Sequence, residues 1–240
     1  MSGSLLLAWQ AIMDHPLFWV GVTLAAYQSG VVLYERSGMA VFHPVLVSIL
    51  LLIGIILLLG GELSAYHQSV TPLMVLIGPA TVALAVPLYV NLKRIREFLS
   101  PVLITLLVGG TLATLATIVI AWGLRIEHSL VMTMAPKSVT TPIAMLVAEQ
   151  TGGIAALAAV FVMITAVIAA VFGPWLLRIV GVRSEAAWGL SMGICAHAIG
   201  TALSLERSKE AGAFAALGMS LMGITTAILL PLAVTVWVMV

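Results

Sequence analysis

The side chains best suited to chemistry lie in one stretch of the chain, residues 134–145, which reads MAPKSVTTPIAM. Lys137 places a positive charge among long apolar runs. Hydroxyl groups follow it at Ser138, Thr140 and Thr141. The pair Thr141-Pro142 predicts the start of a half-helix, because threonine caps helices well and proline is favoured at the first helical position. The free N–H groups and positive dipole end of that half-helix would face Lys137, which predicts a binding site for a small carboxylate.

The same stretch must interrupt any membrane helix that contains it. Pro136 and Pro142 each lack an N–H and clash with the preceding turn, which excludes an ordinary continuous helix. A charge or an irregular backbone at membrane depth must be buried in protein, or be solvated by water or a ligand. We therefore predict a broken helix that lines a binding site. The alternative is that Lys137 extends to the interface or pairs structurally with Glu149 or Glu206, which are also the acids we consider for ion coupling.

A second polar stretch, residues 191–204, reads SMGICAHAIGTALS. His197 stands among small apolar residues, and Gly200-Thr201 offers a local helix break with a hydroxyl group. A histidine that titrates near a carboxylate site can couple transport to protons. We expect His197, Gly200 and Thr201 to complete the substrate site. The alternative is that His197 is a packing residue whose hydrogen bonds are satisfied within the helix bundle.

A third stretch, residues 78–88, repeats part of the pattern in the first half of the chain. Gly78-Pro79-Ala80-Thr81-Val82, with Pro87 further on, resembles residues 135–139 with Pro142 further on. Paired Pro-broken segments in corresponding halves indicate a transporter site at a repeat interface. We predict that Gly78, Pro79 and Pro87 break a helix, that Thr81 joins the site, and that the repeat halves cover about 41–124 and 125–240. The alternative is that these prolines kink helices for packing alone.

Composition places the whole chain in a membrane. Of its 240 residues 62% are apolar and 8% are charged, and the mean hydropathy is +1.21; soluble domains carry about 25% charged residues. Four runs approach or exceed the roughly 20 residues that cross a bilayer: Met39–Gly60, Pro101–Leu124, Ile154–Leu177 and Gly212–Val240. We predict an all-α, polytopic helical bundle that forms a single membrane domain over residues 1–240. The short alternating segments of a transmembrane barrel do not occur.

Basic residues constrain which segments cross the bilayer. Eight segments follow one another, the fifth being the broken stretch around Lys137 and the seventh Ala186–Ser204. Placing Arg36 and Lys93–Arg96 on the cytoplasmic side agrees with two spans between them. Keeping Arg178–Arg183 and Arg207–Lys209 there as well would require the fifth and seventh segments to be re-entrant. The alternative is that all eight cross, and we favour an external N-terminus. Because the positive region of a secretory signal is missing, we expect the first apolar segment to remain in the mature protein.

Several kinds of function find no support in the sequence. No phosphate-binding glycine loop, zinc-type His/Cys spacing, Ser-His-Asp set or paired intramembrane acids occur, and all Asp and Glu residues lie at segment ends or in loops. We therefore expect no enzyme, no cofactor, no metal site and no cation antiporter. The formal net charge of +1 and the lack of a basic cluster with interleaved aromatics indicate no nucleic acid partner. The single cysteine, Cys195, excludes an internal disulfide, and we expect it to be a small buried packing residue.

At these stretches the sequence resembles the LrgB/CidB family of bacterial membrane proteins. The resemblance covers about Val41 to the C-terminus, and the PKSVTTPIA string is its most specific part. The stretches that carry it are residues 78–89, residues 136–145, Ala196-His197-Ala198-Ile199-Gly200-Thr201-Ala202, Glu206 and Gly212-Ala213-Phe214. Family members commonly carry a basic residue three positions after the glycine of the histidine motif, where this chain has Leu203. Arg207 lies about one helical turn further and is available to compensate.

The resemblance implies a bacterial plasma (inner) membrane protein. The family was named for antiholin-like control of murein hydrolase activity and autolysis, usually beside a holin-like partner of the LrgA/CidA type. It is also linked to transport of small monocarboxylates such as pyruvate, and of glycolate and glycerate by a plastid relative. Two hypotheses follow. The first is an elevator-like carrier of small monocarboxylates, expected to form a homo-oligomer such as a dimer. The second is a regulator of lysis that binds a holin-like partner and transports nothing.

Overall fold

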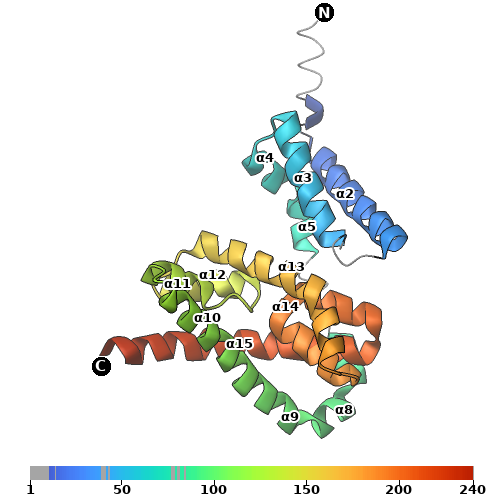
Figure 1. Ribbon diagram of the computed structural model, residues 1–240. Coiled ribbons are helices and arrows are strands. Elements are labelled where there is room, and N and C mark those ends of the chain that lie inside the picture. The colour runs from blue at the N-terminus through green and yellow to red at the C-terminus, as the bar shows by residue number, and fades with distance from the viewer. Residues whose placement is uncertain are drawn as a thin grey trace, which may run out of the picture. The chain divides into compact units, whose positions relative to one another are not determined.

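The computed structural model describes residues 11–13, 15–38, 42, 44–76, 79, 82–83 and 85–239. All elements longer than a single turn in this part of the chain are helices, as predicted. The chain divides into two compact units, Met1–Ala83 and Leu84–Val240 (Figure 1). The prediction of a single domain with two repeat halves stays a prediction.

The first unit is built on a pair of antiparallel helices. It contains α2 (Pro16–Ser37), α3 (Pro44–Leu59), α4 (Leu63–Ser69) and α5 (Thr71–Val75). Gly30 allows close approach, because a Cβ atom there would lie 2.7 Å from the carbonyl oxygen of Pro44. The Trp19 ring is buried and meets Tyr66 edge-on at 5.7 Å between ring centroids. The glycine contact thus joins α2 to α3, and the aromatic contact joins α2 to α4.

The second unit holds the predicted site. Its elements are α7 (Ala85–Val90), α8 (Leu92–Glu97), α9 (Leu99–Ile104), η2 (Thr105–Gly110), α10 (Thr111–Gly123), α11 (His128–Met134), α12 (Thr141–Gln150), α13 (Ala155–Ile179), α14 (Glu185–Arg207) and α15 (Lys209–Met239). The elements α9, η2 and α10 form one continuous helix with a π-helical turn in the middle.

Five helices of the described chain are long and apolar enough to cross a membrane. They are Leu17–Ser37, Leu99–Gly123, Ala155–Ile179, Glu185–Arg207 and Lys209–Trp237, and Pro44–Leu59 is a shorter apolar helix. The protein is therefore a multi-pass helical membrane protein, as its composition predicted.

The helix α14 meets the length requirement, yet it folds back on itself and forms a hairpin. His197 has φ 37° and ψ −118°, values that interrupt the helix at its middle. A Cβ atom on Gly200 would collide with the carbonyl oxygen of Met192, and Arg207 pairs with Glu185 at 2.8 Å. In a straight α-helix Glu185 and Arg207, the first and last residues of α14, would lie about 33 Å apart along the axis, at 1.5 Å per residue. The two ends of α14 therefore lie at the same end of the bundle.

Small residues join the first arm of this hairpin to α15. A Cβ atom on Gly189 would collide with the carbonyl oxygen of Ala211, and one on Gly193 with that of Ala215. Because the two glycines and the two alanines have the same order and spacing along the chain, the first arm and α15 run parallel. Small residues at four-residue spacing are the usual means by which membrane helices approach closely.

Most basic residues of the second unit lie at the end where the α14 hairpin is anchored, whereas Arg125 follows α10 at the other end. Arg94 pairs with Glu210 at 3.2 Å and Arg207 with Glu185, while Leu177 and Val182 pack on Trp188 and Ala211. The basic residues brought to this end are Lys93, Arg94, Arg96, Arg178, Arg183, Arg207 and Lys209. By the positive-inside rule we predict that this end faces the cytoplasm. The re-entrant form of the seventh segment is thus the one the structure adopts.

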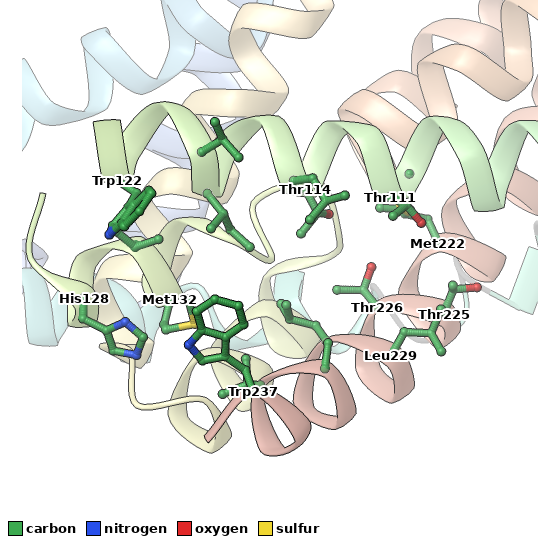
Figure 2. Close-up of a pocket in the computed structure, with 18 of the residues that line it drawn as sticks. Thr111, Thr114, Trp122, His128, Met132, Met222, Thr225, Thr226, Leu229 and Trp237 are labelled. Atoms are coloured by element: carbon green, nitrogen blue, oxygen red, sulfur yellow. The ribbon is translucent and has the colours of Figure 1, made fainter. Parts of the chain in front are cut away.

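An apolar groove lies between α10 and α15. Its volume is about 690 Å³. Figure 2 shows Trp122 and His128 toward one end of the groove and Thr111 and Thr225 toward the other. Its lining contains no Lys, Arg, Asp or Glu, and Lys137 does not contribute to it. The groove therefore lacks the charge that a carboxylate site requires.

We predict that Gly193→Ala destabilises the protein by about 1–3 kcal/mol, because the added methyl group forces α14 away from α15. The midpoint of thermal unfolding in detergent, followed by size-exclusion chromatography, measures this. Gly54→Ala in α3 is the matched control, because nothing lies within 4 Å of its added Cβ atom. Equal midpoints for Gly193→Ala and wild type would contradict the close packing.

Candidate functional site

The stretch around Lys137 is a broken helix, as predicted. The helix α11 ends at Met134, and α12 begins at Thr141 with Pro142 in its first turn. Between them, Ala135, Ser138 and Val139 are buried while Lys137 is half-buried. The two prolines thus interrupt the chain at the point where the sequence placed the charge.

The first turn of α12 leaves backbone N–H groups without acceptors among the described residues. The N-cap is Thr140 (φ −64°, ψ 147°), one residue earlier than predicted, and its side chain makes no capping bond. Ala144 donates to the carbonyl oxygen of Thr140 at 2.9 Å, whereas the N–H groups of Thr141 and Ile143 find no acceptor among the described residues. Unsatisfied N–H groups and the helix dipole make such a terminus favourable for an anion.

The segment α11–α12 is a second hairpin, pinned where it meets α13. Thr133 donates from its hydroxyl to the carbonyl oxygen of Ser129 at 2.6 Å, and its oxygen accepts from the N–H of Ile154 at 2.8 Å. A Cβ atom on Gly153 would lie 2.8 Å from the Thr133 nitrogen. Val131 and Met132 pack on Ala121 near the end of α10 and on Val234 near the end of α15. This hairpin therefore enters from the end opposite to the α14 hairpin.

At the tip of α14, side chains satisfy the backbone groups that the reversal exposes. The His197 imidazole lies with Nε2 3.3 Å from the carbonyl oxygen of Val162 in α13. Thr201 donates to the carbonyl oxygen of His197 at 2.8 Å, and Ser204 to that of Gly200 at 2.6 Å. Thus His197, Gly200 and Thr201 are brought together, and the histidine and threonine use their polar atoms to hold the reversal.

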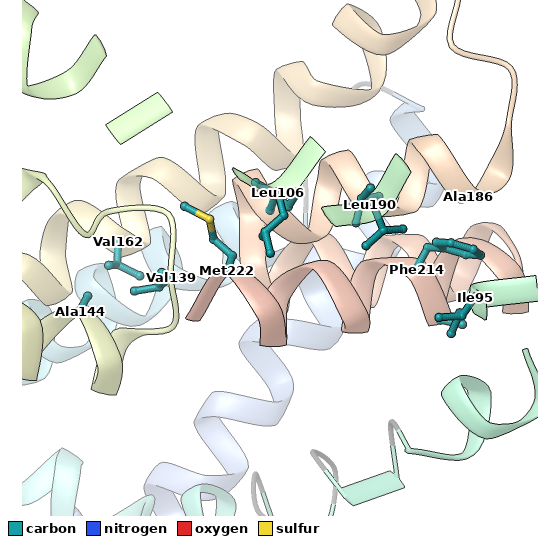
Figure 3. Packing of buried hydrophobic residues seen from close by; sticks show 12 residues of the cluster. Ile95, Leu106, Val139, Ala144, Val162, Ala186, Leu190, Phe214 and Met222 are labelled. Atoms are coloured by element: carbon teal, nitrogen blue, oxygen red, sulfur yellow. The ribbon is translucent and has the colours of Figure 1, made fainter. Parts of the chain in front are cut away.

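The two tips meet in the middle of the second unit. Val139 from the first tip, Val162 from α13 and Ile194 from the second tip belong to one buried cluster (Figure 3 labels Val139 and Val162). Lys137 of the first tip and Cys195 of the second lie near enough for the charge of one to affect the other. The prediction that Cys195 is buried is wrong, because its side chain is exposed while Ile194 and Ala196 beside it are buried. Cys195 continues the exposed face of the first arm, on which Ala187 and Ser191 also lie.

Lys137 has no ion-pair partner in the described part of the chain. Neither Glu149 nor Glu206 pairs with it, and both are exposed in the last turns of α12 and α14. The structural-pairing alternative for Lys137 is therefore wrong. The role of the two acids in coupling stays a prediction.

The remaining predicted residues lie elsewhere. Gly78 and Thr81 fall outside the described residues, Pro79 is helical, and Pro87 lies in α7 with its side chain outside the description. Leu203 is half-buried and packs on the cluster that includes Trp188 and Met192. Arg207 binds Glu185 and stacks 4.8 Å from the centre of the Trp188 ring, so it holds the base of the hairpin and does not replace a charge at position 203. No group of three or more His, Cys, Asp or Glu suited to a metal occurs among the residues described.

Comparison with known proteins shows to which family the chain belongs. The model of a family described as the LrgB-like family matches residues 23–236. The chain belongs to the LrgB-like family. Two relatives from Bacillus subtilis, the uncharacterised proteins YwbG and YxaC, are 34% and 32% identical over 85% and 89% of this chain and 91% and 93% of their own lengths. The antiholin-like protein LrgB of Bacillus cereus is 29% identical over 90% of this chain and 95% of its own length.

No solved structure matches this LrgB-like chain. The match covers both re-entrant hairpins of the second unit and most of the first unit. The relatives in Bacillus fit a bacterial plasma membrane.

We predict that His197→Gly is more stable than His197→Ala. Both variants lose the contact to Val162, but only glycine adopts φ 37° without steric cost. The strain of a non-glycine residue there, about 1–3 kcal/mol, exceeds the entropic cost of glycine, about 0.5–1 kcal/mol. Thermal midpoints in detergent compare the two variants. An alanine variant at least as stable as the glycine variant would show that the reversal is not strained.

Proposed function

We propose that this LrgB-like protein is a carrier of small monocarboxylates of the pyruvate or glycolate type, and not an enzyme. The observation that carries the proposal is the meeting of two re-entrant hairpins from opposite ends of the bundle, with Lys137 at their contact. Broken helices whose half-helix N-termini face an anionic group are a recurring way to build transporter sites at the bilayer midplane.

The charges of the site support an anionic substrate. Lys137 lies at the tip without an acidic partner, and the N–H groups of Thr141 and Ile143 add partial positive charge beside it. A charge at this depth is costly unless it is solvated or paired. A carboxylate bound to Lys137, with the hydroxyls of Ser138 and Thr140 as further donors, supplies the missing negative charge.

The architecture offers a way to alternate access. Each hairpin separates the site from one end of the bundle, so movement of the unit that carries both hairpins against a scaffold would expose the site to each side in turn. We propose that this motion is elevator-like and that the scaffold forms a homodimer. His197, beside the contact of the two tips, is the group we assign to proton coupling.

A second function is favoured by the names of the relatives. The protein of Bacillus cereus is called antiholin-like. Under this alternative, the chain regulates murein hydrolase activity by binding a holin-like membrane partner of the LrgA/CidA type, and it transports nothing. Both roles can coexist, because carboxylate flux alters the energetics of the membrane. The alternative alone leaves the free charge of Lys137 without a purpose.

We predict that proteoliposomes containing this protein alone take up labelled pyruvate or glycolate, and that Lys137→Ala lowers uptake at least about tenfold, the effect of removing one charge-assisted hydrogen bond. Lys93→Ala is the matched control, because it removes an exposed lysine from α8 and should leave uptake unchanged. Imposed proton and sodium gradients test the coupling.

Two outcomes would count against the carrier. Saturable uptake that persists in Lys137→Ala would remove the proposed site. Absence of uptake by wild type under all gradients, with or without an added holin-like partner, would favour the regulatory function.

A further inference from the structure

The groove between α10 and α15 reaches from one surface of the bilayer to about its middle. Thr111 lies halfway along the span that contains α10, and Thr225 lies near the middle of the span formed by α15. Toward the other end of the groove lie Trp122 and Trp237 (Figure 2), which are 77% and 81% exposed. Tryptophan is enriched where the membrane meets water. From Thr111 to Trp122, α10 rises by about 16 Å at 1.5 Å per residue, close to half of the roughly 30 Å hydrocarbon core.

The walls of the groove are apolar, and the first hairpin forms its floor. Between the threonines at one end and the tryptophans at the other, every residue of α10 and α15 that lines the groove is aliphatic. Leu115, Val119 and Leu229 of these walls are exposed. Val131 and Met132 of α11 are buried and also line the groove, so they form its floor. An occupant of the groove therefore packs against the α11–α12 hairpin.

The width of the groove favours a lipid chain over a helix. A volume of about 690 Å³ over at least about 16 Å of length gives a mean cross-section of at most about 40 Å². An α-helix with its side chains is about 10–12 Å across, so its cross-section is about twice as large. An extended acyl chain is one methylene group wide and spans half of the hydrocarbon core, which agrees with both the width and the length of the groove.

The aromatic end of the groove offers partners to a phosphate group. Arg125 lies three residues after Trp122, is exposed, and has no ion-pair partner among the residues described. His128 lines this end of the groove (Figure 2) and adds a polar ring nitrogen. Glu127 lies between them in the sequence and does not pair with Arg125. A guanidinium group that is free of a carboxylate is well suited to bind phosphate.

We propose that the groove between α10 and α15 binds one acyl chain of a phospholipid, with the phosphate of that lipid beside Arg125. The chain packs on Val131 and Met132 and holds the α11–α12 hairpin against the bundle. This inference goes beyond the proposed carrier function and does not depend on it, because the lipid stabilises the fold whether or not the protein transports a carboxylate.

The first experiment asks which side chains the lipid touches. Full-length protein is reconstituted in vesicles of dioleoyl phosphatidylglycerol that contain a small share of phosphatidylglycerol with a diazirine in one acyl chain. Extraction into detergent removes loosely bound lipid. Light then converts the diazirine, with loss of nitrogen, into a carbene that inserts into a C–H bond, and mass spectrometry of peptides locates the product. Leu115 and Leu229 should be labelled several-fold more than Leu112 and Leu232, which are more exposed but lie outside the groove.

Two results would overturn the proposal. Equal labelling of the four leucines, or none, would show that no lipid is held in the groove. Weaker labelling of Leu115 and Leu229 than of Leu112 and Leu232 is the result expected if a second copy of the chain or a partner protein covers the groove.

The second experiment fills the groove with a side chain. Ala233→Phe places an aromatic ring in it, and Ala227→Phe is the matched control, since Ala227 is an exposed alanine of α15 outside the groove. Native mass spectrometry in detergent should show one retained phosphatidylglycerol on wild type and Ala227→Phe, and several-fold less on Ala233→Phe. Arg125→Gln should also lower retention several-fold, and Arg125→Lys should largely restore it. Equal retention by Ala233→Phe and wild type would overturn the groove as the site.

The third experiment measures whether the lipid supports the fold. Dioleoyl phosphatidylglycerol added to the protein in detergent should raise the midpoint of thermal unfolding by several degrees for wild type and Ala227→Phe, because a ligand that binds only the folded state stabilises it. The same lipid should leave the midpoint of Ala233→Phe unchanged. Equal rises in all three proteins would show that the lipid acts elsewhere and would overturn the proposal. None of the three experiments measures uptake, so failure of the carrier function would not affect them.

Discussion

The reversal at His197 is the constraint on which the rest of the second unit depends. A chain that turns back inside a membrane must satisfy its backbone groups without water, and each unsatisfied group costs several kcal/mol. Here Thr201 covers the carbonyl oxygen of the reversal at 2.8 Å, and the imidazole reaches α13 at 3.3 Å. Arg207 and Ser208 both bind Glu185 and hold the base of the hairpin closed. Without the reversal, α14 would be an ordinary spanning helix, and its two ends would not meet at the Glu185–Arg207 pair.

The fold of the two hairpins also determines the electrostatic surroundings of Lys137. The contact of two hairpins brings Lys137 to the middle of the bundle, while the acids of the described chain that form ion pairs do so with arginines at the cytoplasmic end. The lysine is thus left beside a helix N-terminus, where positive charge accumulates. Under the proposed carrier function, this balance of charge favours a bound anion.

Much of this arrangement could be predicted from the sequence, and the parts that could not be predicted have physical reasons. Pro136 and Pro142 predicted the helix break around Lys137 directly, because proline is incompatible with a helix interior. The second break contains no proline, so the sequence indicated a polar, glycine-containing stretch but not a reversal at His197. The re-entrant form had been one of two alternatives allowed by Arg178–Arg183 and Arg207–Lys209, and tertiary contacts between Glu185 and Arg207 decided it.

The most direct test of the account asks from which side of the membrane the two ends of α14 are reached. Ser184→Cys and Lys209→Cys, each in the Cys195→Ala background, place single thiols at the two ends of the hairpin, and Ile154→Cys marks the start of α13 at the other end of the bundle. An impermeant maleimide is applied to right-side-out and inverted membrane vesicles. The account predicts that Ser184→Cys and Lys209→Cys react only from the cytoplasmic side and Ile154→Cys only from the outside. Reaction of Ser184→Cys and Lys209→Cys from opposite sides would show that α14 crosses the membrane and would contradict the account.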